Sequence, residues 1–181
     1  MLYRTFDEFM LQCRNQKVAH MEHDVMNVDT LKATAQMLIR RPVAEVFDAF
    51  INPEITTKFW FTKSSGRLIS GAQIQWDWEM YGATTQVDVK AIEPNQRIVI
   101  EWGDAGDRST VEWIFTPRGD DQTYVEIINS GFSGTDDEIV GAAIDSMGGF
   151  TTVLCGLKAL LEHGIQLNLI GDKFPDAHVS S

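Results

Sequence analysis

Residues 135–164 read TDDEIVGAAIDSMGGFTTVLCGLKALLEHG, and this stretch predicts one long helix. Thr135 is followed three residues later by Glu138, which is a capping box: the side chain of each residue accepts a backbone N–H of the other. The two aspartates between them suit the positive end of the helix dipole. Gly164 is a natural stop. Some 28 residues at 1.5 Å each give a helix of roughly 40 Å, enough to cross a whole sheet.

Apolar side chains form one broad stripe along this predicted helix. They are Ile139, Val140, Ala143, Ile144, Met147, Phe150, Thr151, Leu154, Leu157, Leu161 and Ile165. Gly148 and Gly149 interrupt the helix, and each costs up to about 1 kcal/mol relative to alanine. We therefore expect either a close approach of the helix to the sheet or a kink at this pair.

Between Ser65 and Asn129 the hydrophobic period changes to two, which predicts strands. The apolar phases are Ile74, Trp76, Trp78 and Met80; Thr85, Val87, Val89 and Ala91; Ile98, Ile100 and Trp102; Val111, Trp113 and Phe115; Val125 and Ile127. Glycine and proline turn signals separate the segments. One dry and one wet face are typical of antiparallel pairing, and the short connections favour a meander.

The chain before the meander predicts a strand and two short helices. Residues 31–40 read as a strand in which one of two sets of alternate residues faces inward. The sets are Ala33, Ala35, Met37 and Ile39, or Thr34, Gln36 and Leu38. Pro42 suits the first turn of one helix, and Asn52 suits the N-cap of the next. We place an N-terminal extension, partly helical or disordered, at 1–28, the domain at 29–168 and a C-terminal tail at 169–181. The fold class is α+β, a curved antiparallel sheet around a long C-terminal helix.

Composition excludes several classes of partner. The chain has 181 residues, about one domain, and a net charge of -11. This charge argues against nucleic acid and against anionic membranes. No apolar run is expected to span a membrane and no signal peptide is expected, so we predict a cytoplasmic location. Cys13 and Cys155 are expected to act as small apolar residues and not to form a disulfide.

Four tryptophans share the dry phase of the predicted sheet. A strongly twisted sheet that curls around one helix has an interior too wide to fill everywhere, which favours an apolar cavity. The alternative is that the same indoles fill the core. The expected lining residues are Trp60, Trp76, Trp78, Met80, Val87, Ile100, Trp102, Trp113, Met147, Phe150 and Leu154.

The sequence shows no complete set of catalytic groups. The inward phases contain almost no titratable side chain, which general acid–base chemistry needs. Tyr81, Arg108, Asp145 and Ser146 are the candidates near a cavity mouth. Residues 20–24 (HMEHD) could be read as metal ligands, but no cysteine or further histidine is near. We predict no metal, no cofactor and no catalytic residue.

The order of elements resembles the START-like, Bet v 1-like helix-grip superfamily, and within it the Hsp90 ATPase activator homologue family. The resemblance is carried by residues 39–50, Asn52-Pro53-Glu54, Phe59-Trp60, Gly71, residues 92–98, Glu101-Trp102, Gly149-Phe150, Leu154, Leu157 and Glu162-His163-Gly164. Phe59-Trp60 and Gly149-Phe150 depart from the family's usual Trp-Trp and Gly-Trp. The resemblance implies a cavity between sheet and helix that accepts hydrophobic ligands. It supplies no catalytic motif.

Three functions remain open from the sequence. The first is a protein that binds a small hydrophobic molecule in this cavity. The second is a cyclase-like or hydrolase-like enzyme that uses the same cavity. The third is an interaction module, either associated with a chaperone or a homodimer.

Overall fold

The computed structural model describes residues 28–103 and 106–179. Seven strands form one antiparallel sheet in the order β1-β7-β6-β5-β4-β3-β2. The strands are β1 (Lys32–Ile39), β2 (Lys63–Ser64), β3 (Gln73–Trp78), β4 (Ala83–Glu93), β5 (Arg97–Trp102), β6 (Ser109–Pro117) and β7 (Thr123–Ser130). β3 to β7 follow one another as the predicted meander, and β1 adds to β7.

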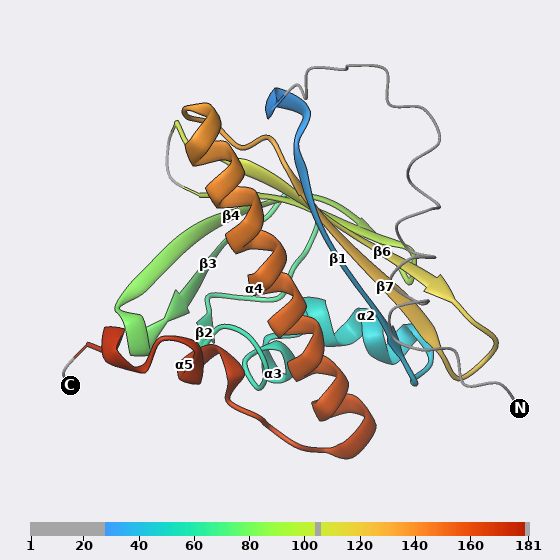
Figure 1. Ribbon diagram of the computed structural model, residues 1–181. Coiled ribbons are helices and arrows are strands. Elements are labelled where there is room, and N and C mark those ends of the chain that lie inside the picture. The colour runs from blue at the N-terminus through green and yellow to red at the C-terminus, as the bar shows by residue number, and fades with distance from the viewer. Residues whose placement is uncertain (1–27, 104–105, 180–181) are drawn as a thin grey trace, which may run out of the picture.

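One long helix lies across the sheet. This helix, α4 (Asp136–His163), runs beside β1 in Figure 1, while the sheet curves around it. Two short helices, α2 (Val43–Ile51) and α3 (Pro53–Thr56), pack at one end. The remaining helices are η1 (Val28–Thr30), η2 (Glu79–Tyr81), α5 (Leu169–Lys173) and η3 (Pro175–Ala177). The helix-grip fold is confirmed.

The predicted helix ends are confirmed. The backbone N–H of Thr135 donates to Glu138 Oε2 at 2.8 Å, and both halves of the capping box are present. The backbone and hydroxyl hydrogen bonds from Thr135 lower the pKa of the Glu138 carboxyl. Gly164 ends the helix with a φ of 69°, a left-handed conformation that glycine adopts without a Cβ penalty. Asn52 accepts the backbone N–H of Glu54 as the N-cap of α3.

The glycine pair in α4 does not make the close approach that we expected. The helix runs unbroken, and a Cβ built on Gly148 or Gly149 has no heavy atom within 4 Å. A close approach occurs instead at Gly156, to the loop after α3 and not to the sheet: a Cβ there would lie 3.2 Å from the carbonyl oxygen of Phe59. The apolar stripe is also narrower than expected, because the sheet covers only one side of the helix. Ile144, Met147 and Ile165 are 61%, 46% and 51% exposed.

Two strand expectations are corrected by local geometry. A bulge between Val89 and Ala91 shifts the register of β4, so Ala91 pairs with Val99 while Ile92 pairs with buried Ile98 and packs on the core. β3 ends at Trp78, and Met80 lies in the 3-10 helix η2 instead of on the sheet. In β1 the phase of Ala33, Ala35 and Ile39 faces inward.

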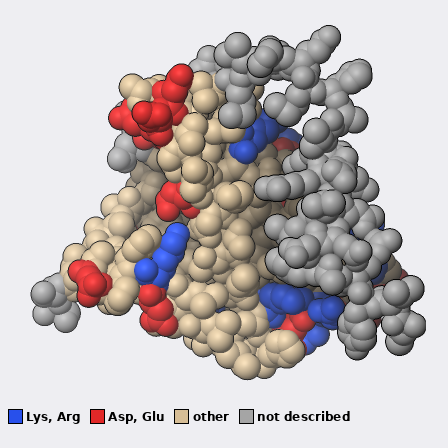
Figure 2. Space-filling model, viewed as in Figure 1, with Lys and Arg blue, Asp and Glu red and all other residues tan. Residues whose placement is uncertain are grey.

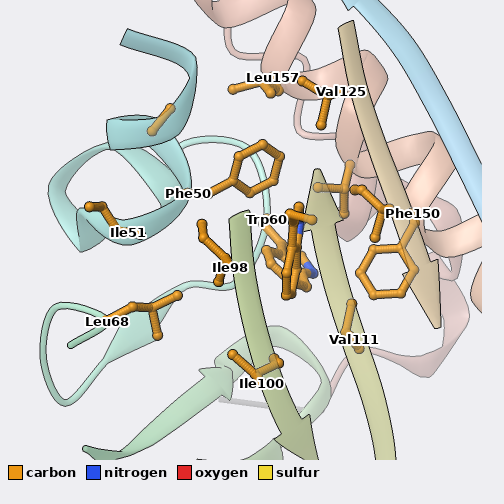
Figure 3. Close-up of a cluster of buried hydrophobic side chains, with 14 of the residues drawn as sticks. Phe50, Ile51, Trp60, Leu68, Ile98, Ile100, Val111, Val125, Phe150 and Leu157 are labelled. Atoms are coloured by element: carbon orange, nitrogen blue, oxygen red, sulfur yellow. The ribbon is translucent and has the colours of Figure 1, made fainter. Parts of the chain in front are cut away.

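The core is densest where α2 and α3 meet the sheet. Figure 3 shows Phe50 of α2, Trp60 of the loop after α3 and Phe150 of α4 converging over β5 and β6. Phe50 lies edge-on to Phe115 at 5.8 Å between ring centroids and 6.0 Å from Trp113. The fully buried indoles Trp76 and Trp113 belong to this core.

Cys155 is exposed on α4, so its expected role as a buried apolar residue is wrong. It lies on the side of the helix that the sheet does not cover. Cys13 and the histidine cluster at 20–24 lie outside the described residues, as does the expected N-terminal helix.

Candidate ligand-binding site

A half-open cavity of about 510 Å³ lies between the middle of α4, the sheet and the C-terminal segment. Its walls come from Trp60, Trp78, Tyr81, Ala83, Trp102, Asp107, Ser109, Asn129, Phe132, Ala142, Asp145, Ser146, Gly149, Phe150, Val153, Ile170, Lys173 and Phe174. Its volume is within the range of pockets for small molecules, about 300–1,000 Å³.

Three aromatic side chains separate this cavity from the packed core. Trp60 lies 5.8 Å from Phe150 and 6.2 Å from Trp102 between ring centroids, and Trp102 lies 5.8 Å from Phe150. Trp60 and Phe150 are buried, whereas Trp102 is half-buried. The inner surface of the cavity is therefore aromatic and held by packing from behind.

The residues predicted to line a cavity are divided by the structure into three groups. Trp60, Trp78, Trp102 and Phe150 do line it. Five others are fully buried in the core behind it: Trp76, Val87, Ile100, Trp113 and Leu154. Met147 is exposed on α4, and Met80 lines a separate small hollow of about 60 Å³ beside Gly156 and Leu167. Whether a ligand contacts the first group stays a prediction.

The C-terminal segment provides the outer wall, which the sequence did not suggest. Ile170, Lys173 and Phe174 line the cavity from α5 and the residue after it. The hydroxyl of Tyr81 donates to the carbonyl oxygen of Ile170 at 2.5 Å. Further along, the backbone N–H of Val179 donates to the carbonyl oxygen of Met80 at 2.9 Å. The residues expected to form a C-terminal tail thus pack against η2 and α4, although the domain boundary itself stays a prediction.

Asn129 is a buried polar residue in the cavity wall that the sequence pattern was not used to predict. It lies on the inward phase of β7, two residues after Ile127, and is 2% exposed. Its side-chain amide donates to Ser146 Oγ at 3.0 Å. Extending the alternation of Val125 and Ile127 by one step would have found it, because residues i and i+2 share a face.

The titratable side chains of the cavity lie at its rim. Asp145 is 79% exposed and lies 3.7 Å from Lys173 Nζ. Asp107, also exposed, accepts a hydrogen bond from Ser133 Oγ at 2.8 Å. Of the candidates near the mouth, Tyr81, Asp145 and Ser146 reach the cavity, and Arg108 does not. The Arg108 guanidinium instead binds Asp88, and this hydrogen bond holds the pKa of the Asp88 carboxyl below its usual value.

Within the described residues no three histidine, cysteine, aspartate or glutamate side chains gather in a way that could hold a metal ion. The charged residues around the cavity are few. In Figure 2, acidic side chains gather over the first turn of α4, and the surface along the helix below is mostly uncharged.

By length and composition, α4 is long and apolar enough to cross a membrane, with a mean hydropathy of 1.4 over an 18-residue window. The expectation that no apolar run spans a membrane stays a prediction. The core helix of a soluble protein meets the same criterion, and α4 is the helix that the sheet grips. The cytoplasmic location stays a prediction.

A curved antiparallel sheet around a C-terminal helix, with a half-open cavity between them, defines a helix-grip protein of the START-like, Bet v 1-like class. A family model described as "Activator of Hsp90 ATPase homolog 1-like protein" matches residues 40–162. The chain belongs to this family. None of the curated proteins compared with the chain matches it.

Solved structures share the fold. SSP2350 from Staphylococcus saprophyticus is 28% identical, with a TM-score of 0.65, and the match covers 76% of this chain and 96% of that one. CalU16 from Micromonospora echinospora is 18% identical, with a TM-score of 0.60 and coverage of 82% and 93%. The Aha1 dimer from Colwellia psychrerythraea is 17% identical, with a TM-score of 0.62 and coverage of 74% and 98%.

Proposed function

We propose that this protein binds a small hydrophobic molecule in the half-open cavity beside α4. One observation carries the proposal: about 510 Å³ of space opens to solvent in front of an aromatic wall formed by the mutually packed rings of Trp60, Trp102 and Phe150. Burying apolar surface contributes about 25 cal/mol per Å² before the costs of association. An aromatic wall that packing already holds in place loses little entropy when a ligand binds.

The glycine pair of α4 provides a matched test. Gly149 lines the cavity and Gly148 is exposed, and a Cβ atom at either position meets no heavy atom within 4 Å. Gly149→Leu should therefore fill part of the cavity, while Gly148→Leu should point into solvent. Both changes remove a helical glycine, so their effects on the helix itself are comparable.

The measurement is a fluorescence titration with N-phenyl-1-naphthylamine, an uncharged dye that brightens in apolar surroundings. We expect saturable binding to the natural chain and to Gly148→Leu. Gly149→Leu should bind at least about tenfold more weakly, since the filled volume blocks contact with Trp102 and Phe150. No saturable binding, or equal binding by both variants, would contradict the proposal.

Catalysis by the same cavity has less support than binding. A general acid or base works best when it is desolvated near the reacting group. Asp145 is mostly exposed, and Tyr81 already donates its proton to a backbone carbonyl. The described cavity thus places its ionisable groups at the entrance.

The homodimer and the chaperone-associated module stay predictions. Light scattering measures the molar mass in solution and so tests the homodimer.

A further inference from the structure

The wall of the cavity holds a buried polar atom that has no partner among the described residues. Asn129 lies on β7 between Ala33 of β1 and Val111 of β6, which are both buried. Its amide nitrogen donates to Ser146 Oγ, but its Oδ1 atom accepts no hydrogen bond from any residue in the described part of the chain. A buried polar group left unsatisfied costs about 1–3 kcal/mol. A ligand with a hydrogen-bond donor would remove this cost.

Two serine hydroxyls in the cavity wall complement the Asn129 oxygen. Ser146 Oγ accepts from the Asn129 amide, and Ser109 Oγ accepts from the indole N–H of Trp102 at 3.0 Å. Within residues 28–103 and 106–179, neither hydroxyl donates to a neighbour. Each therefore keeps one proton to donate. The cavity offers one acceptor and two donors within otherwise aromatic and aliphatic walls, and a hydroxyl group can use both kinds because it donates and accepts.

The charges around the entrance select against an anion. Asp107 and Asp145 lie at the rim, and the nearby Lys173 is already 3.7 Å from Asp145. The chain as a whole carries a net charge of -11. A carboxylate would also find the Asn129 oxygen opposed to it, since both groups only accept hydrogen bonds. The polar end of the ligand is therefore neutral.

We propose that Asn129 and Ser146 recognise the hydroxyl of a neutral aromatic or alicyclic alcohol whose apolar body lies against Trp60, Trp102 and Phe150. The hydroxyl donates to Asn129 Oδ1 and accepts from Ser146. This inference rests on the proposed binding function and adds the chemical class of the ligand.

Four naphthalenes with the same ring system test this assignment by isothermal titration calorimetry: 2-naphthol, 2-methylnaphthalene, 2-methoxynaphthalene and 2-naphthoate. Burial of apolar surface alone favours the methyl compound over the alcohol. A hydrogen bond to the Asn129 oxygen reverses this order. We expect 2-naphthol to bind about tenfold more tightly than the methyl and methoxy compounds, and 2-naphthoate to bind most weakly.

Substitutions in the cavity wall test whether Asn129 and Ser146 cause the preference for 2-naphthol. Asn129→Leu should remove the preference for 2-naphthol over 2-methylnaphthalene while keeping or improving the affinity for the latter. Ser146→Ala, on the helix surface of the cavity, should reduce the preference about threefold or more and serves if Asn129→Leu does not fold. Thr123→Val replaces another buried polar residue of β7, far from the cavity, and should leave the preference unchanged.

The outcomes separate the two proposals. If 2-methylnaphthalene and 2-naphthol bind equally, or if the methoxy compound matches the alcohol, the cavity binds apolar molecules but the assignment of Asn129 is wrong. A preference that survives both Asn129→Leu and Ser146→Ala also overturns it. If none of the four compounds binds, both the assignment and the proposed function fail.

Discussion

The space between α4 and the sheet is packed at one end and hollow at the other, although the same face of the sheet lines both. The closed end is the core beside α2 and α3, and the open end is the cavity. At the closed end, Phe50 of α2 packs between Phe59 of the loop after α3 and Trp113, with ring centroids 5.8 Å and 6.0 Å away. At the open end, Trp78 and Trp102 are half-buried, and the five-residue helix α5 is the covering element. An inward tryptophan of this sheet therefore fills the core or lines the cavity according to which element covers it.

The largest expected difference is between Trp113 and Trp78. Trp113→Ala should lower the free energy of unfolding by about 3–5 kcal/mol, since it leaves a cavity in the closed end. Trp78→Ala should cost only about 1–2 kcal/mol, because its side chain is half-buried and solvent can occupy the space. Urea denaturation of both variants measures this. Equal losses would show that the two ends are packed alike.

Glycines of α4 provide the next comparison. Gly156→Ala places a Cβ 3.2 Å from the Phe59 carbonyl oxygen at the closed end, so the Phe59 backbone has to give by a few tenths of an ångström, and we expect a loss of about 1–3 kcal/mol. Gly148→Ala meets open space and should gain about 0.5–1 kcal/mol from helix propensity. Thermal unfolding distinguishes the signs. A stabilising Gly156→Ala would mean that α4 can move away from the loop after α3.

Glu162 fastens the last turn of α4 to the end of β1. Burial raises the pKa of its carboxyl, but hydrogen bonds from Lys158 and from the Arg40 backbone N–H at 2.7 Å, together with the charges of both residues, leave the pKa below its usual value. A carboxyl whose folded pKa is lowered stabilises above its unfolded pKa, and this stability is lost as pH falls through the folded pKa.

Glu162→Gln should therefore lower the free energy of unfolding by about 1–2 kcal/mol at pH 7. The difference from the natural chain should shrink below about pH 4, as the natural carboxyl becomes protonated. Denaturation at a series of pH values measures it. Glu45→Gln, in an exposed pair with Arg41, is the control and should change stability little at any pH. A pH-independent Glu162→Gln effect would rule out the charge as its cause.

The smallest effect is expected at the outer wall of the open end. Tyr81→Phe removes the hydrogen bond to the carbonyl oxygen of Ile170 and should cost about 0.5–1 kcal/mol. Amide hydrogen exchange should accelerate in Leu169–Lys173 and not in β6. Tyr124→Phe, on β7 beside Arg118, should leave exchange in α5 unchanged. Unchanged exchange in the Tyr81→Phe variant would mean that other contacts hold the wall.

Much of the fold could be predicted from local patterns. The capping box at Thr135, the stop at Gly164 and the alternation of the strands each follow from neighbours in sequence, and all are confirmed. The bulge near Ala91 and the contact of Gly156 with Phe59 could not, because both depend on the partner across the structure. The buried stripe of α4 was predicted too broad for the same reason, because hydrophobic periodicity does not tell how much of the helix surface the sheet covers.

The site was predictable only in part. Alternation placed all the tryptophans of the sheet on the inward face but could not tell Trp102, which lines the cavity, from Trp113, which fills the core. That distinction depends on where α2 and α3 pack. Asn129 could have been predicted, because it continues the inward alternation of Val125 and Ile127 on β7. The wall from Ile170 to Phe174 carried none, because a five-residue helix is too short for a periodic pattern.

The position of that wall in the chain has a consequence for relatives of this protein. The family match ends at residue 162, and the outer wall begins at α5, after it. The aromatic inner wall of the cavity and its outer wall are thus encoded in separate stretches of the chain. Substitutions at Ile170, Lys173 and Phe174 can therefore alter the outer wall while the inner tryptophans stay the same.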